Sequence, residues 1–61
     1  MTAKITPEII STLRRELQHV RHESLLATRQ GDFMKVARLT AHAARLNKSI
    51  MDAEGELMAQ A

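Results

Sequence analysis

The chain has 61 residues, of which 44% are hydrophobic, with no cysteine and a single aromatic residue. Its length allows one domain with a small core, and the absence of cysteine excludes a disulfide or a thiolate metal site as a source of stability. Nine basic residues against seven acidic ones leave a net charge of +2, an excess too small to indicate nucleic-acid binding by itself.

A first helix is predicted to begin near the start of the chain. Thr6 can cap it, Pro7 suits the first helical position because its missing N–H would have no partner there, and Glu8 complements the helix dipole. Apolar and small residues then recur at steps of three and four, which keeps them on one face of a helix. This row consists of Ile10, Leu13, Leu17, Val20, Ser24 and Ala27. We therefore expect a helix over about residues 7–29.

The stretch RQGDFMKV, residues 29–36, is predicted to contain a tight turn between two helices. Gly31 fits the position just past a helix end, where the backbone often takes a positive φ, and Asp32 fits the capping position before the next helix. We therefore place the turn at about residues 30–32. Phe33, the only aromatic residue, is expected to pack across this closed end.

A second helix is predicted over about residues 33–59, where no proline interrupts another apolar row. That row consists of Val36, Leu39, Ala43, Leu46, Ile50, Ala53 and Leu57. Two such rows predict an all-α fold, a coiled-coil-like antiparallel two-helix hairpin that forms one domain over residues 1–61. Its expected core consists of Ile10, Leu13, Leu17, Val20, Val36, Leu39, Ala43, Leu46, Ile50 and Ala53.

The two rows also predict how the helices are aligned. Folding the chain about the turn sets small residues opposite larger ones in most layers, which lets facing side chains interdigitate. The same alignment places Arg14 level with residues 50–52 and Glu16 near Lys48. We expect these charged side chains to form exposed ion pairs that contribute little stability.

A second set of apolar residues lies outside the core rows, and two helices in contact cannot cover it. These residues are Leu25, Leu26, Ala37, Ala44, Met51 and Met58. We expect them to form an intermolecular face, most simply in a homodimer whose two hairpins make a four-helix bundle, with a heteromeric protein partner as the alternative. Asn47 and Glu54 fall on the apolar arc of the second helix, where a buried Asn would specify the register and the number of partners. The alternative is that both residues line the rim of the interface, which we favour for Glu54 because burial of its charge is unfavourable.

The three histidines are the candidate metal ligands. Histidines on successive helical turns can bind a divalent metal together with a carboxylate, and His19, His22 and Glu23 are so placed on the first helix. The predicted alignment brings His42 of the second helix to nearly the same level. They lie on the outer flank, away from the apolar rows, where exposed histidines explain the pattern equally well. We therefore expect neither a metal nor another cofactor.

No pattern in the sequence indicates catalysis. The serines and threonines lack a nucleophile signature, there is no glycine-rich phosphate loop, and a hairpin offers no concave pocket that would exclude water. The expected function is therefore that of a non-enzymatic protein–protein interaction module, such as a small adaptor or a chaperone-like subunit.

A nucleic-acid-binding accessory protein is the alternative function. It would use a positive ridge made of Arg14, Arg21, Arg38, Arg45 and Lys48. Because Glu16, Glu23 and Asp52 are interspersed with these residues, we favour a solvated face of mixed charge. With no apolar run long enough to span a bilayer and no signal-peptide pattern, we expect a cytoplasmic protein without a membrane partner.

Residues 31–50, with the sequence GDFMKVARLTAHAARLNKSI, resemble two families of helical hairpins. One is the UVR motif, through which nucleotide-excision-repair subunits pair with each other. The residues that match its second helix are Phe33, Val36, Ala37, Leu39, Ala43 and Leu46, whereas Met34, Thr40 and Ala41 differ from its pattern. The other is the flagellar export-chaperone hairpin, which similarly has Gly-Asp, an aromatic residue and an arginine near Arg45. Both resemblances imply a non-enzymatic module that binds another protein.

Overall fold

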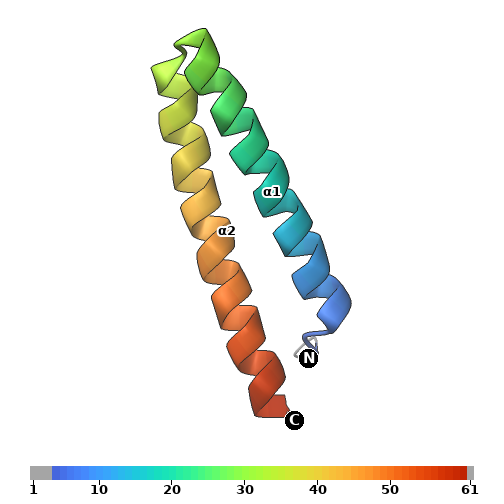
Figure 1. Ribbon diagram of the computed structural model, residues 1–61. Coiled ribbons are helices and arrows are strands. Elements are labelled where there is room, and N and C mark those ends of the chain that lie inside the picture. The colour runs from blue at the N-terminus through green and yellow to red at the C-terminus, as the bar shows by residue number, and fades with distance from the viewer. Residues whose placement is uncertain (1–3, 61) are drawn as a thin grey trace.

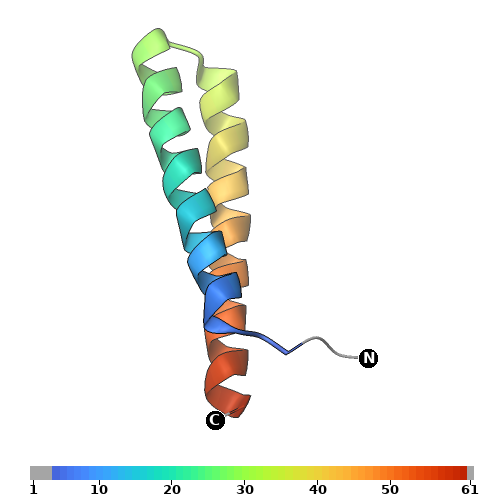
Figure 2. The ribbon, with the colours of Figure 1, turned by 90° about the vertical axis from the view of Figure 1, so that its right-hand side faces the viewer.

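The computed structural model describes residues 4–60, which form two α-helices joined by a short turn (Figure 1). Helix α1 spans Pro7–Gln30 and helix α2 spans Phe33–Gln60, so the helices begin where predicted and each ends one residue later. They lie antiparallel and side by side as a rod of 45 × 18 × 15 Å (Figure 1, Figure 2). This arrangement confirms the predicted all-α hairpin.

The start of α1 has the predicted cap. Thr6 has an extended backbone with φ −118° and ψ 158°, and its hydroxyl oxygen accepts a hydrogen bond from the Ile9 N–H at 3.4 Å. Pro7 occupies the first turn, where no backbone N–H is required, and Glu8 lies beside the positive end of the helix dipole. The capping residues therefore fix where α1 begins.

The turn between the helices depends on Gly31 and Asp32. Gly31 has φ 73° and ψ 17°, a left-handed conformation, and its N–H donates to the Thr28 carbonyl at 3.1 Å. The Asp32 N–H donates to the Ala27 carbonyl at 3.0 Å, which satisfies a second free carbonyl at the end of α1. The Asp32 Oδ1 atom then accepts a hydrogen bond from the Lys35 N–H at 3.2 Å and caps α2. One residue thus ends a helix and the next begins another.

The core is a single seam between the two helices. Its centre is a cluster of buried side chains, Leu17, Val20, Leu46 and Ile50. Half-buried residues packed against the cluster are Leu13, Leu39 and Ala43. Toward the ends of the seam the buried residues are Ile10, Ala27 and Ala53, and Val36 is half-buried. Every predicted core residue is therefore buried or half-buried, and Ala27 joins them with 1% of its surface exposed.

Phe33 does not pack across the closed end as predicted, since 73% of its surface is exposed. It is the first residue of α2, and α1 already ends at Gln30, so no further turn of α1 is available to cover the ring. Only from Val36 onward does α2 face the opposite helix along the seam.

Replacing Gly31 by Val is expected to destabilise the hairpin by roughly 1–2 kcal/mol, because a side chain in the left-handed region strains the backbone. The loss comes from conformation alone, since a Cβ atom at Gly31 would meet no atom within 4 Å. Thermal unfolding followed by circular dichroism at fixed concentration measures it. Asn tolerates this conformation, so Gly31→Asn is the matched control and should lose much less. Equal melting temperatures for Gly31→Val and the unchanged chain would show that this geometry is not what stabilises the turn.

Candidate interaction surface

Large apolar side chains are exposed on the surface of the hairpin, mainly on α2. The most exposed are Met34, Met58, Phe33, Met51 and Leu25. Met34 and Met58 expose 79% and 78% of their surface, although they lie at opposite ends of the same helix. Within residues 4–60, neither helix carries an apolar stretch long enough to cross a membrane.

A continuous row of exposed and mostly apolar residues runs along α2, on the side turned away from α1. The row steps by three and four residues, as the core row does, and every member is exposed. We call it the outer row of α2, and it consists of Met34, Ala37, Ala41, Ala44, Lys48, Met51, Gly55 and Met58. It contains the four α2 residues predicted for the intermolecular face and adds Met34, Ala41 and Gly55. Lys48 is its one charged member.

The exposed area of the chain is large for its mass. A compact monomer of 6.9 kDa is expected to expose about 4,000 Å². The hairpin exposes 4970 Å², which is about 1,000 Å² more than this expectation. A protein–protein interface of standard size buries about 800 Å² on each partner. The excess is therefore as large as the area that one such interface would cover.

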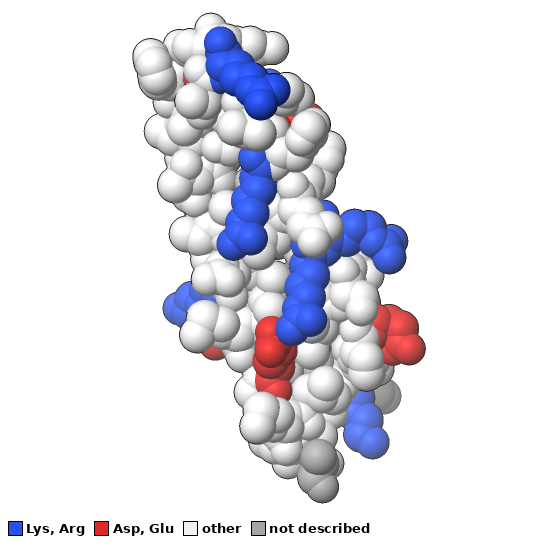
Figure 3. Space-filling model, viewed as in Figure 1, with Lys and Arg blue, Asp and Glu red and all other residues white. Residues whose placement is uncertain are grey.

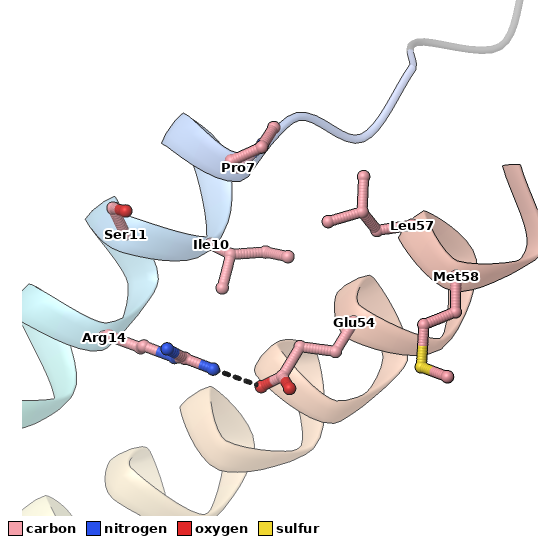
Figure 4. A pocket seen from close by; sticks show the side chains of 7 residues that line it. All are labelled: Pro7, Ile10, Ser11, Arg14, Glu54, Leu57 and Met58. Carbon is pink, nitrogen blue, oxygen red and sulfur yellow. Dashed lines mark hydrogen bonds and ion pairs between the residues drawn. The ribbon is translucent and has the colours of Figure 1, made fainter. Parts of the chain in front are cut away.

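A shallow hollow of about 310 Å³ opens between the free ends of the helices (Figure 4). Its lining residues are Pro7, Ile10, Ser11, Arg14, Glu54, Leu57 and Met58. The side chains of Ile10 and Leu57 point into the space between the helices, and an ion pair between Arg14 and Glu54 lies along one side (Figure 4). The hollow is thus apolar with a charged edge.

The polar residues beside the outer row lie at its edge. The Arg14 Nη2 atom donates to the Glu54 Oε1 atom at 2.9 Å, and Glu54 is half-buried. Asn47, one heptad before Glu54, is exposed. Within residues 4–60 no polar or charged side chain is buried. Both residues are therefore placed where the rim of a contact through the outer row would lie.

The ion pairs between the helices differ from those predicted. Arg14 pairs with Glu54 rather than with a residue at 50–52, and Glu16 lies 3.6 Å from His42 Nε2 rather than near Lys48. An arginine side chain is long enough to reach a carboxylate about one helical turn away along the facing helix. The alignment of the two helices therefore does not determine which carboxylate Arg14 pairs with.

Leu25 and Leu26 were expected on one intermolecular face, but adjacent helical residues lie about 100° apart. Leu25 is 50% exposed and lies on the same side of α1 as Arg14, whereas Leu26 is half-buried. Only Leu25 can extend the exposed apolar surface on the side of the Arg14–Glu54 pair.

The candidate metal ligands are dispersed. His19 and His22 are exposed, and Glu23 and His42 are half-buried. The carboxylate nearest to His42 belongs to Glu16, which was not among the predicted ligands. In the described part of the chain, no three His, Asp or Glu side chains are grouped so that they could bind a metal ion.

The basic residues do not form one ridge, although all of them are exposed. They are Arg14, Arg21, Arg38, Arg45 and Lys48. Arg14 and Arg21 lie on the side of Glu54, whereas Arg38 and Arg45 lie about 160–180° around α2 from Glu54. Figure 3 shows basic side chains spaced along one face, with acidic side chains among them in its lower half. The predicted ridge is therefore divided between two faces of the hairpin.

No family model matches the chain, and no curated protein or solved structure shows significant similarity to it. The resemblance to the UVR and flagellar export-chaperone hairpins therefore rests on residues 31–50 alone. A function has to be inferred from the surface just described.

Replacing Glu54 by Gln is expected to lower the free energy of unfolding by at most about 1 kcal/mol, because the paired side chains are 60% and 44% exposed and water screens them. Urea denaturation at low and high salt measures the loss, which should shrink as salt is raised. Glu56→Gln is the control, because within residues 4–60 Glu56 has no ion pair. A loss of several kcal/mol, or one that salt does not reduce, would contradict a weak exposed pair.

Proposed function

We propose that the chain is a non-enzymatic protein–protein interaction module that self-associates through the outer row of α2. The observation that carries the proposal is the exposure of this whole row, which includes Met34, Met51 and Met58. Contiguous apolar surface of this kind is uncommon on monomeric proteins and marks interaction sites. The simplest assembly is a symmetric dimer of two hairpins, whose four helices form a bundle.

The composition of the row suits contact between helices. Ala37, Ala41 and Ala44 are small enough to let another helix approach closely, and the flexible methionines can fill the spaces that remain. Lys48 can keep its charged group in water while its aliphatic part lies along the apolar surface. A single lysine in the row is therefore compatible with burial of the surface around it.

Energetic reasoning supports association as well. A 61-residue chain without a disulfide has little core to offset the conformational entropy of folding. Covering further apolar surface adds about 25 cal/mol for each Å² removed from water. A second copy that covers the outer row would stabilise both hairpins, so folding and association are expected to be coupled.

Replacing Ala44 by Glu is expected to shift the protein from dimer to monomer, because it places a charge in the middle of the row where burial is unfavourable. Sedimentation velocity over a range of concentrations measures the shift, and circular dichroism should show lower stability with helical structure retained at low temperature.

Ser49→Glu is the matched control, because it adds the same charge five residues further along α2, at an exposed residue outside the row. It should leave the mass of the assembly unchanged. A dimer that forms equally well with Ala44→Glu would exclude the outer row as the interface. A folded monomer for the unchanged chain would instead favour a heteromeric partner for this surface.

A further inference from the structure

We infer that the two copies associate with α2 against α2 in antiparallel orientation, so that the closed end of each hairpin lies over the open end of the other. This rests on the proposed self-association and adds to it the identity and direction of the contacting helices. Three features of the structure carry it: the pattern of residue sizes along the outer row, the position of Lys48, and the shapes of the two ends.

When the outer row is reversed, two of its four layers set a small residue opposite a long one. A twofold axis level with residue 46 places Met34 opposite the partner's Met58. The same axis places Ala37 opposite the partner's Gly55, and Ala41 opposite the partner's Met51. A Cβ atom built on Gly55 would meet no atom within 4 Å, so the surface above this glycine is open to another helix. Ala41 thus lies opposite a methionine and Ala44 opposite Lys48, which lets side chains interdigitate in these layers, whereas the Met34 layer pairs two methionines.

A parallel pairing of the same row would be less favourable. It would set each residue opposite its own copy, so that no layer would pair a small residue with a long one. It would also bring the two Lys48 ammonium groups to the same level, where like charges repel. In the antiparallel pairing each Lys48 lies opposite the partner's Ala44, on either side of the axis. Antiparallel helix dipoles also favour this direction.

The two ends of the hairpin differ in shape, and the antiparallel pairing brings them together. At the closed end Phe33 and Met34 project with 73% and 79% of their surface exposed. At the open end lies the hollow that Ile10, Leu57 and Met58 line. Phe33 precedes Glu54 by 21 residues, three heptads, so in a coiled-coil geometry it lies on the side of α2 toward which the hollow opens. The projecting end of one copy therefore lies at the level of the other copy's hollow.

The hairpin exposes enough surface for such a pairing. The hairpin exposes 4970 Å², about 1,000 Å² beyond a compact chain of its mass. The outer row runs from Met34 to Met58, a length of roughly 36 Å at 1.5 Å per residue.

Disulfide cross-linking tests the orientation directly, because the chain has no cysteine of its own. Met34→Cys and Met58→Cys proteins are prepared separately, then unfolded, mixed, refolded and mildly oxidised. Cysteines at facing positions can form a disulfide, since this requires Cα atoms about 4.4–6.8 Å apart. We expect several-fold more covalent dimer in the mixture than in either variant alone. Ser49→Cys, outside the row, should give only the background level.

The outcomes separate this inference from the proposed function. If Met34→Cys alone cross-links as well as the mixture, the copies are parallel and the inference is wrong. If no variant cross-links although sedimentation shows a dimer, the copies associate through another surface, which also overturns it. A monomeric mass for the unchanged chain would instead contradict the proposed self-association itself.

Discussion

The seam between α1 and α2 is the contact on which the rest of the structure depends. Leu17 and Val20 pack against Leu46 and Ile50 along one face of each helix. Two helices can cover only one face of each other, so any further apolar residue must lie outside the seam. On α1 most of the remaining surface is polar, whereas α2 carries a second apolar row. The same contact that makes the hairpin therefore leaves one apolar face of α2 uncovered by α1.

The turn gives this arrangement its alignment. Gly31 takes the left-handed conformation that ends α1, and Asp32 caps the start of α2, so the chain reverses within two residues. A turn this short leaves little freedom for one helix to slide along the other. It therefore fixes the layers of the seam, the position of the hollow at the open end and the projection of Phe33 at the closed end. The surface proposed for association is determined by the same few residues that determine the fold.

The fold could be predicted from the sequence because its signals are local and periodic: a cap at Thr6, a turn at Gly31 and Asp32, and two rows of apolar residues in step with a helix. The predictions that were wrong concern the contacts of single side chains, which the helical periodicity does not determine. Phe33 fits a packed end by its apolar character, yet α1 has no further turn to cover it. Arg14 pairs with Glu54 instead of with a residue at its own level of α2, because the arginine side chain is long. The outer row was recognised only in part, since alanine and glycine give little signal until the structure shows that Ala41 and Gly55 are exposed beside the methionines.

We propose that one face of α2 is covered by a second copy of the chain. The most direct test is the mass of the purified protein in solution, measured by sedimentation equilibrium across micromolar concentrations while its helical content is monitored. We predict a mass twice that of the 6.9 kDa chain, with helical content that falls as dilution dissociates the dimer. A fully helical protein with the mass of a single chain over this whole range would contradict the account.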